Sequence, residues 1–134
     1  IIIVQVKKSS SAGGGSTDIT VSEDKLFLFS LAEIYSQRGI SKSDNSNISG
    51  NADTYQEEGT QYEYFKELLG DADPYDDNEE IIKRKANGGG STYSWWLRSP
   101  YIGNATSFRL VSSYGNVNTS LAGNTCGVCF GFCV

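Results

Sequence analysis

The C-terminal segment of the chain, residues 99–134, differs in composition from everything before it. It carries one charged side chain, Arg109, whereas the preceding 98 residues carry the other 26 charges, including every Asp and Glu. Such a composition is typical of a Gly-, Ser- and Asn-rich run of short strands. Every residue type in the segment also has a codon that ends in a pyrimidine, so scrambling the first two positions of such codons would give the same result. Composition alone leaves these two origins open.

The length and charge of the chain narrow its class. At 134 residues it fits a single domain that can bury a core without metal or disulfide staples. The net charge is −5 and the longest basic run is Lys83-Arg84-Lys85, so we expect no nucleic-acid partner. The apolar residues 1–4 are too few to span a bilayer, and we expect no membrane insertion. Because the chain contains no Met, we expect residues to precede Ile1.

Three cysteines near the C-terminus, Cys126, Cys129 and Cys133, have the spacing C-x₂-C-x₃-C. Thiolates are soft ligands, but a tetrahedral site needs a fourth ligand and the chain has no His. Residues 127–134 alternate like a buried strand. Their large apolar side chains would fill one face of that strand: Val128, Phe130, Phe132 and Val134. We therefore expect cysteines that pack in the core, no metal and no cofactor, with a disulfide as the remaining alternative.

The N-terminal half predicts strands followed by a short helix. Residues 1–6 and 18–21 are apolar and β-branched, and the Gly- and Ser-rich stretch between them favours a hairpin. Residues 25–29 indicate a short buried strand. Ser30 and Glu33 have the spacing of a capping box, which predicts a helix from Leu31. Residues 39–53 show no apolar period, and we expect a long surface loop there.

A second helix is expected at residues 61–69. Thr60 and Glu63 repeat the capping-box spacing, and Gly70 follows as a natural C-terminal residue. We expect one apolar face, formed by Tyr62, Phe65 and Leu69, to pack on sheets that contain Leu26, Leu28, Trp96 and Phe130. The acidic residues 71–80 depart from the EF-hand pattern at its sixth and twelfth positions. A solvated loop is therefore expected, and calcium binding stays open.

Both tryptophans of the chain lie side by side in residues 93–100. On a strand, Trp95 and Trp96 would point to opposite faces, so one can anchor the core and the other needs a second buried layer or a partner. A strand at residues 106–112, a turn at 114–116 and a polar loop at 118–125 are expected to follow.

Four segments carry a family resemblance that covers nearly the whole chain in order. They are KLFLFS at residues 25–30, EGTQYEYF at 58–65, WWLRSP at 95–100 and GVCFGFCV at 127–134. Together they resemble a family common in gut bacteria and their phages, often described only as a domain of unknown function. The resemblance implies an α+β, C-type-lectin-like fold, shared with formylglycine-generating-enzyme-like domains. In it, two short antiparallel sheets and two helices support a loop-rich ligand face. One such domain would span residues 1–134 and lack its N-terminal part.

Some proteins with this fold are targets of diversity-generating retroelements, which rewrite adenines in a C-terminal stretch of the gene. The resemblance therefore favours the genetic origin of the unusual composition and marks residues 99–134 as a candidate variable region. The template repeat that such an element requires would be found in the DNA.

The resemblance also divides the C-terminal half into scaffold and candidate ligand face. Arg98 is expected to bond backbone carbonyls or a carboxylate. The scaffold positions are Trp95, Trp96, Leu97, Arg98, Phe108, Val111, Gly127, Phe130 and Phe132. The candidate ligand-binding positions, expected to be exposed, are Tyr101, Ser107, Arg109, Ser112, Tyr114, Asn116, Asn118, Ser120 and Asn124. Among these, Tyr101, Arg109 and Tyr114 are expected to project from one surface and to dominate binding.

A binding function fits the sequence better than catalysis does. The chain has no His, its carboxylates are confined to residues 18–80, and the cysteine spacing differs from the active-site pair of formylglycine-generating enzymes. Loops rich in Tyr, Ser, Asn and Gly are typical of binding surfaces. We predict a non-enzymatic module that binds a protein or glycan on a cell surface, and that is itself extracellular, on a cell surface or on a phage particle. The alternatives are a structural surface, pilus or tail module and, less readily, a formylglycine-generating-type enzyme.

Overall fold

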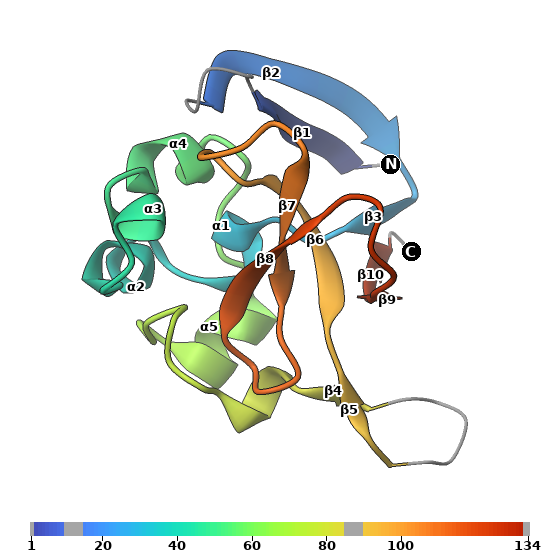
Figure 1. Cartoon of the computed structure of the whole chain (residues 1–134). Coiled ribbons are helices and arrows are strands. Elements are labelled where there is room, and N and C mark those ends of the chain that lie inside the picture. The colour runs from blue at the N-terminus through green and yellow to red at the C-terminus, as the bar shows by residue number, and fades with distance from the viewer. Residues whose placement is uncertain (1, 10–14, 85–89, 133–134) are drawn as a thin grey trace.

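The chain folds as an α+β domain in which the helices gather on one side of a central sheet (Figure 1). The computed structural model describes residues 2–9, 15–84 and 90–132. Within these ranges, side chains are described for residue 23 and from residue 25 onward. The β1–β2 hairpin, formed by Ile2–Ser9 and Gly15–Asp24 as predicted, lies at the top of the view, with β1 against β6. A second hairpin joins β4, Lys83–Arg84, to β5, Thr92–Tyr93.

The central sheet has the strand order β8-β7-β6-β9. The strands are β6 (Trp95–Pro100), β7 (Ser107–Val111), β8 (Val117–Leu121) and β9 (Gly127–Val128). The β6–β7 and β7–β8 pairs are antiparallel, but β6 and β9 are parallel. The prediction of purely antiparallel sheets is wrong here, because residues 122–126 carry the chain back across the sheet before β9 begins. The expected polar loop at residues 118–125 is also wrong in its first half, which forms β8.

The two predicted helices exist, but only one of the two capping boxes does. Helix α1, Leu31–Ile34, has the predicted box: the Glu33 amide donates to Ser30 Oγ (3.2 Å) and the Ser30 amide donates to Glu33 Oε2 (2.9 Å). Helix α5, Glu63–Leu69, begins two residues later than expected and has no side-chain cap. The Tyr62 amide donates to the Glu33 carbonyl oxygen (2.9 Å) instead, so a tertiary contact sets its start.

Residues 39–53 are not a surface loop. Most of them belong to three short helices, α2 (Gln37–Lys42), α3 (Ser46–Ser49) and α4 (Ala52–Gln56), joined by short connections. Side chains of Ser36 and Asn45 cap α2 and α3. Ile40 and Ile48 are fully buried. Because each of these helices is so short and contributes so few buried residues, the sequence shows no helical period. Residues 71–80 do form the expected loop, which ends in the 3-10 turn η1, Glu79–Ile81.

The core lies between the helices and the face of the central sheet that the helices cover. Its members are Leu31, Ile34, Tyr35, Ile40, Ile48, Ala52, Tyr55, Phe65, Leu69, Ile81, Trp95, Leu97, Ile102, Val111 and Val117. Of the two tryptophans, Trp95 is fully buried and Trp96 is half-buried, so they do point to opposite faces.

The C-terminal cysteine segment is two short strands in two sheets, rather than one strand. The chain bends at Cys129, and β10, Phe130–Phe132, pairs antiparallel with β3, Leu26–Leu28. A Cβ on Gly131 would lie 2.4 Å from Phe27 Cζ, so the glycine side of β10 faces inward. Phe130 and Phe132, expected as buried scaffold, are 48% and 69% exposed.

The α5 face therefore packs differently from the prediction. Phe65 contacts Phe29, with ring centroids 5.2 Å apart, and Tyr62 contacts Phe27 and Phe29. Leu26 points outward and is 54% exposed. The prediction placed Leu26 and Leu28 toward the helix. Successive residues of a strand point to opposite faces, and the residues that contact the helix are Phe27 and the following Phe29.

Candidate binding surface

Strand register sorts the candidate ligand residues onto two faces of the central sheet. Residues opposite each other in register share a face. Arg109 and Val111 pair with Thr119 and Val117 and face the helices; we call this side of the sheet the inner face. The opposite side, the outer face, carries two rows of paired residues: Trp96, Leu110 and Asn118 in one row, and Phe108 and Ser120 in the other.

Three of the nine candidate residues are buried, which corrects the prediction that they are exposed. Ser107, Arg109 and Ser112 are 7%, 1% and 8% exposed. Alternation along β7 places Ser107 and Arg109 on the inner face, where Arg109 contacts residues of α3 and α4. Ser112 lies in the turn after β7. None of the three can be part of an open ligand face.

Arg109 instead fastens the helices to the sheet. Its Nε donates to Tyr55 Oη (2.9 Å) and its Nη2 donates to the Asn47 carbonyl oxygen (2.8 Å). The guanidinium carbon lies 5.4 Å from the Tyr55 ring centroid and 4.9 Å from that of Tyr101. A guanidinium between two aromatic rings gains cation–π energy while it satisfies buried acceptors. Burial raises the pKa of Tyr55, and the nearby Arg109 charge offsets part of that effect.

Tyr101 belongs to the same cluster and not to an open paratope. Its ring covers Arg109, and its hydroxyl accepts a hydrogen bond from Asn47 Nδ2 (3.0 Å). Tyr101 is half-buried, so its edge reaches the surface beside α3. The expectation that Tyr101, Arg109 and Tyr114 project together from one surface is therefore wrong. Asn47 was missed because it falls in the segment predicted as a loop, residues 39–53, and Tyr55 lies just beyond that segment, in a helix that the sequence did not predict.

Ser112, Tyr114 and Asn116 form the tight turn between β7 and β8. Ser112 Oγ donates to Asn116 Oδ1 (2.6 Å), and Asn116 Nδ2 donates to Asp77 Oδ1 (2.7 Å). The Asn78 amide donates to the Tyr114 carbonyl oxygen (3.0 Å). A Cβ on Gly115 would lie 1.8 Å from the Asn78 carbonyl oxygen. This close approach ties the turn to the acidic loop, and only the Tyr114 side chain, 68% exposed, stands free of it.

The remaining candidates, Asn118, Ser120 and Asn124, occupy the solvent side of β8 and the loop after it. Asn118 and Asn124 are exposed and Ser120 is partly exposed. Asn124 Nδ2 donates to Ser120 Oγ (2.7 Å), which links the loop to the strand. Each keeps amide or hydroxyl groups directed to solvent, as a ligand face requires.

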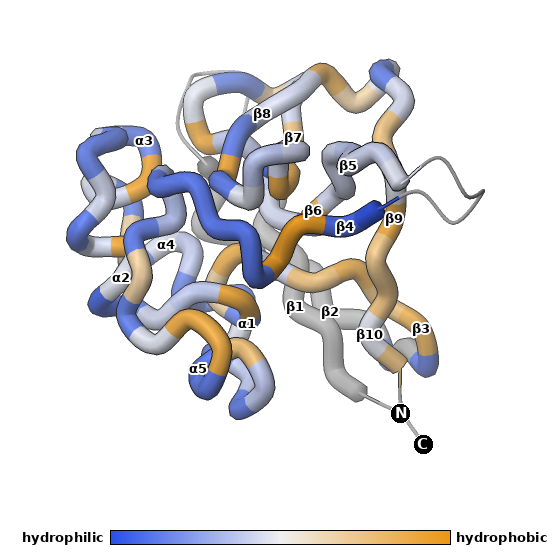
Figure 2. Tube along the Cα trace, turned by 90° about the horizontal axis from the view of Figure 1, so that it is seen from below, coloured by the Kyte–Doolittle hydropathy of each residue, from blue (hydrophilic) through white to orange (hydrophobic). Residues whose placement is uncertain are grey.

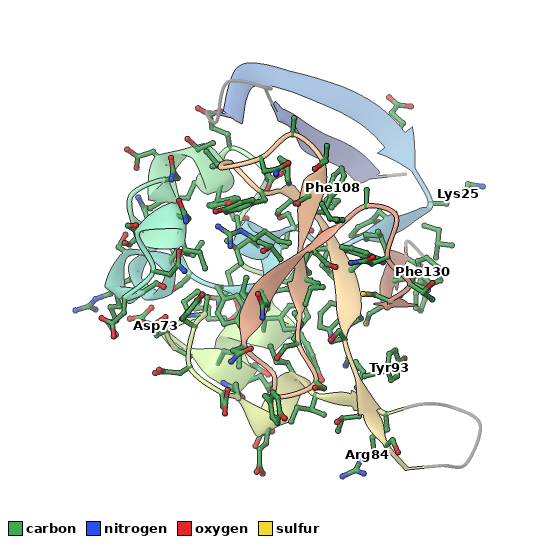
Figure 3. All side chains as sticks on the ribbon, in the orientation of Figure 1. Lys25, Asp73, Arg84, Tyr93, Phe108 and Phe130 are labelled. Carbon is green, nitrogen blue, oxygen red and sulfur yellow. The ribbon has the colours of Figure 1, made fainter. Side chains whose placement is uncertain are left out.

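An apolar groove lies beside these polar groups. It has a volume of about 340 Å³ and is lined by Leu28, Trp96, Leu97, Arg98, Phe108 and Ala122. Trp96 shares a row with Asn118, across the buried Leu110, and Phe108 lies directly opposite Ser120, so the groove and these two polar residues lie on the same side of the sheet. Figure 3 shows Phe108 on the sheet near the β1–β2 hairpin. Trp96 and Phe108 were expected to be scaffold, yet both are half-buried and line this groove.

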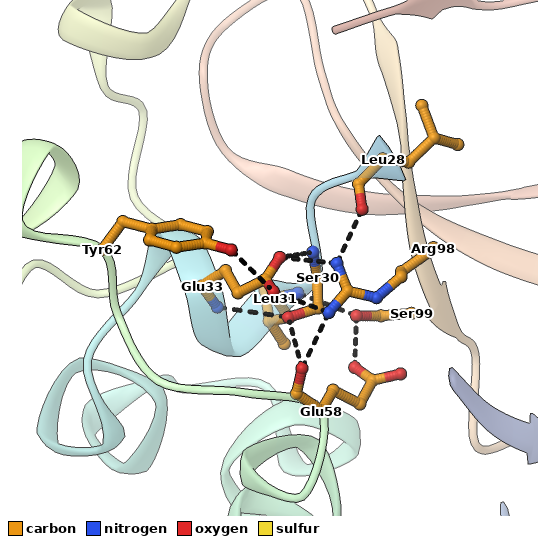
Figure 4. Close-up of polar contacts among 8 residues, drawn as sticks. All are labelled: Leu28, Ser30, Leu31, Glu33, Glu58, Tyr62, Arg98 and Ser99. Atoms are coloured by element: carbon orange, nitrogen blue, oxygen red, sulfur yellow. Dashed lines mark hydrogen bonds and ion pairs between the residues drawn. The ribbon is translucent and has the colours of Figure 1, made fainter. Parts of the chain in front are cut away.

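The floor of the groove is fixed by a buried polar network centred on Arg98 (Figure 4). Arg98 makes a two-bond ion pair with Glu33, Nη1 to Oε2 at 2.5 Å and Nη2 to Oε1 at 2.7 Å. It also donates to the carbonyl oxygens of Leu28 (2.6 Å) and Glu58 (2.8 Å). The prediction that Arg98 bonds backbone carbonyls or a carboxylate is confirmed for both. Ser99 Oγ in turn donates to Glu58 Oε2 (2.5 Å).

Cys126 and Cys129 are free thiols that are both partly buried. Cys129 packs against the core, and Cys133 lies outside the described residues. Burial raises the pKa of both described thiols, and Lys83 partly offsets this at Cys129. Among the described residues, no group of three or more His, Cys, Asp or Glu side chains is placed to hold a metal ion. Nor does any described helix have the length and apolar character needed to cross a membrane.

These features define an α+β domain in which helices cover one face of the central sheet, while an apolar groove and polar side chains lie on the other. The chain belongs to a family described as a domain of unknown function, DUF6273, whose sequence profile matches residues 1–134. Neither a curated protein nor a solved structure matched the chain.

Proposed function

We propose that this protein is a non-enzymatic binding module that captures its ligand on the outer face of the central sheet. The observation that carries the proposal is that the Trp96–Phe108 groove lies on the same side of the sheet as the solvent-reaching side chains of Asn118 and Ser120, to which Asn124 is hydrogen-bonded. Aromatic rings provide contact area, and neighbouring amide and hydroxyl groups provide directional hydrogen bonds. The ligand class we propose is a glycan or protein on a cell surface, met by a module that is itself extracellular or on a phage particle.

The buried charges support binding over catalysis. Glu33 and Arg98 neutralise each other, and Glu58 accepts from Ser99, so these groups hold the scaffold together. The thiols of Cys126 and Cys129 have raised pKa values, because burial disfavours the thiolate. A reactive cysteine needs the opposite shift. These features weigh against the formylglycine-generating type of chemistry.

The proposed architecture is C-type-lectin-like. In support of this, the helices cover one side of a small central sheet, the short β3–β10 sheet stands beside it, and the C-terminal half supplies the turns and loops around the outer face (Figure 1). The structure differs from what the resemblance implies in two ways: it has more short helices, and one of its strand pairs is parallel.

A ligand-binding test can use the two tryptophans as internal reporters. We would record two-dimensional amide and indole NMR spectra while adding soluble oligosaccharides and extended peptides one at a time. A ligand of this surface should shift the Trp96 indole and the Asn118 and Asn124 side-chain amides, while leaving the buried Trp95 indole in place. Trp96→Phe assigns the indole signals. Ligands that shift only residues elsewhere, or a panel without any shift at the outer face, would refute the proposed surface.

We also propose that the outer face is the variable part of a retroelement-diversified protein. The exposed candidates can vary at little cost to stability, whereas Ser107, Arg109 and Ser112 are held in place by the fold. A display library randomised at Asn118, Ser120 and Asn124 should keep most members resistant to protease. A matched library at Ser107, Arg109 and Ser112 should lose most of them. Equal survival of the two libraries would contradict this division. A near-identical, adenine-rich repeat beside the gene would establish the genetic mechanism.

The second candidate function is a structural surface, pilus or tail module. Gly115 and Asn116, locked onto the acidic loop, and the Arg98 network give the rigidity that such a module requires. In that case, substitutions on the outer face would leave every measured interaction unchanged.

A further inference from the structure

Charge is distributed unequally over the molecule. Residues 31–80, which form the helices and the acidic loop, contain thirteen acidic and three basic residues. The four strands of the central sheet contain two charged residues, Arg98 and Arg109, and both are buried. In Figure 2, many of the strongly hydrophilic residues lie along the helices and the segment that follows α5. The strands of the central sheet therefore present no exposed charge to a ligand.

The groove on the outer face has almost no free hydrogen-bonding group. Among its described lining residues, Arg98 alone is charged. Its Nη1 donates to the Leu28 carbonyl oxygen and to Glu33, and its Nη2 donates to Glu33 and to the Glu58 carbonyl oxygen. These four bonds use all four hydrogens of the two nitrogens. Of the other described lining side chains, Trp96 alone has a hydrogen-bonding group, its indole N–H. A charged or hydroxyl-rich group in this groove would therefore lose its bonds to water and find at most one side-chain partner.

The groove has room for one large apolar side chain. Its volume is about 340 Å³, and an apolar cavity of about 150 Å³ is enough to hold benzene. An aromatic or branched aliphatic side chain therefore fits. A sugar ring is of comparable size, but its hydroxyl groups would be buried without partners, which is costly. The groove thus favours a side chain of a protein over a sugar.

The polar residues on the same side of the sheet match the backbone of a protein segment. Asn118 Oδ1 accepts from the Thr119 amide (2.8 Å), which leaves its Nδ2 as a donor. Asn124 Nδ2 donates to Ser120 Oγ (2.7 Å), which leaves Asn124 Oδ1 as an acceptor and the Ser120 hydroxyl as a donor. Each backbone unit of a ligand carries one carbonyl and one amide group. These side chains can therefore bond the backbone that flanks an inserted side chain.

We propose that the ligand is a protein segment without charged side chains, which inserts one aromatic or branched aliphatic side chain into this groove. The inference rests on the proposed function, because it names the ligand of the same surface. Charge complementarity supports it: a charged side chain would leave water for a groove that offers no free counter-charge. The acidic helical side further disfavours segments that carry acidic residues.

The test titrates the protein with capped peptides of sequence GSNXNSG, in which X is Phe, Leu, Ala, Lys or Glu. The NMR shift of the Trp96 indole gives each dissociation constant. The Phe and Leu peptides should bind at least about tenfold more tightly than the Ala peptide, because burial of the larger side chain is worth at least that factor. The Lys and Glu peptides should bind no better than the Ala peptide. Raising NaCl from about 50 to 500 mM should change the affinity of the Phe peptide by less than about twofold, since no ion pair forms.

A matched pair of variants ties this preference to the groove. Ala122 lines the groove and is exposed, and the neighbouring Gly123 is exposed with open space around an added Cβ. Ala122→Asp places a carboxylate at the groove, so the Phe peptide should bind at least about tenfold more weakly and the Lys peptide should become the tighter of the two. Gly123→Asp adds the same charge one residue away and should keep the wild-type order. Thermal melts of both variants confirm that they fold.

Three results would overturn the inference. The first is equal affinity for the Phe, Ala and Lys peptides, and the second is an unchanged order of peptides in Ala122→Asp. The third is a Trp96 indole that shifts with the neutral oligosaccharide chitohexaose but with none of the peptides. That result would make the ligand a glycan and leave the proposed binding surface intact. A Trp96 indole that shifts with no peptide and no oligosaccharide would refute the proposed function as well.

Discussion

Both faces of the β7–β8 hairpin carry serine and other polar side chains, but these side chains have opposite physical roles on the two faces. On the inner face, Ser107 and Arg109 are buried, and Arg109 is bonded to the helices through Tyr55 and Asn47. On the outer face, one residue away along each strand, Asn118 and Ser120 reach solvent beside a groove. Serine, asparagine and arginine therefore do not by themselves indicate a ligand surface. Their position in the two-residue period of the strand decides whether they bind a partner or hold the fold.

The sharpest test of this contrast uses the neighbouring tryptophans. Trp95→Ala should lower the free energy of unfolding by about 3–5 kcal/mol, because it removes a fully buried aromatic side chain from the inner face. Trp96→Ala, on the outer face, should cost about 1–2 kcal/mol, since the side chain is only half-buried. Urea unfolding of both variants measures the difference. Equal losses would mean that the outer face is as tightly packed as the inner one.

A second test asks whether Arg109 is structural. Arg109→Met should cost roughly 2–4 kcal/mol, because it removes a cation between two rings and leaves the Tyr55 hydroxyl and the Asn47 carbonyl without their donor. The control is Arg38→Met, whose side chain is 79% exposed and reaches Asp71 at 3.5 Å. The control should change stability by at most about 0.5 kcal/mol. If Arg109→Met is equally mild, the residue is free to vary and could serve a ligand.

Alkaline pH should weaken the contact between the helices and the β7–β8 turn. Tyr35 is buried and donates to the Gly115 carbonyl oxygen (3.3 Å). Burial, and then the charge of Asp73, raise its pKa well above the usual value. Above about pH 10 the unfolded chain loses this proton while the folded chain keeps it, so stability is constant below that pH and falls as pH rises further.

Urea unfolding at several values between pH 8 and 11 measures this effect. In Tyr35→Phe, the free energy of unfolding should fall less steeply above pH 10. Part of the fall should remain, because the pKa of Tyr55 is also raised. If the free energy of unfolding of the wild type increased above pH 10, this would contradict the burial of both phenols.

The smallest effects should come from the outer face. Asn118→Ala, Ser120→Ala and Asn124→Ala should each change the free energy of unfolding by no more than about 0.5 kcal/mol, because these side chains make no buried contact. Thermal melts of the triple variant would reveal any hidden structural role. A large loss would remove these positions from the candidate ligand face.

Short-range signals in the sequence located several elements correctly. The capping box of α1, the β1–β2 hairpin, the helix that ends before Gly70 and the divergence of Trp95 and Trp96 all follow from local spacing. The polar partners of Arg98 were also predicted in kind. Each depends on residues within one turn or one strand, or on a large side chain with few alternatives.

Long-range contacts account for what the sequence could not supply. The helices α2 to α4 each bury too few residues to show a period, so their core side chains are recognised only against β6 and β7. The burial of Arg109 requires Tyr55 and Asn47, which are more than fifty residues away. The outward turn of Phe130 and Phe132 requires the Phe27 ring over Gly131. The sequence therefore could not show which of the nine candidate residues face solvent, and the fold buries Ser107, Arg109 and Ser112.

The pairing of β3 with β10 has a consequence for how the protein is made. β3 is among the first core segments to leave the ribosome, yet its partner, residues 130–132, is about a hundred residues further along the message. Phe27 therefore stays uncovered until translation has passed the whole Ser- and Asn-rich segment. A premature stop codon or frameshift anywhere in that segment yields a chain that lacks β10 and leaves Phe27 uncovered. Cellular proteases readily remove such incompletely folded chains. Only genes read correctly through β10 would yield a lasting product.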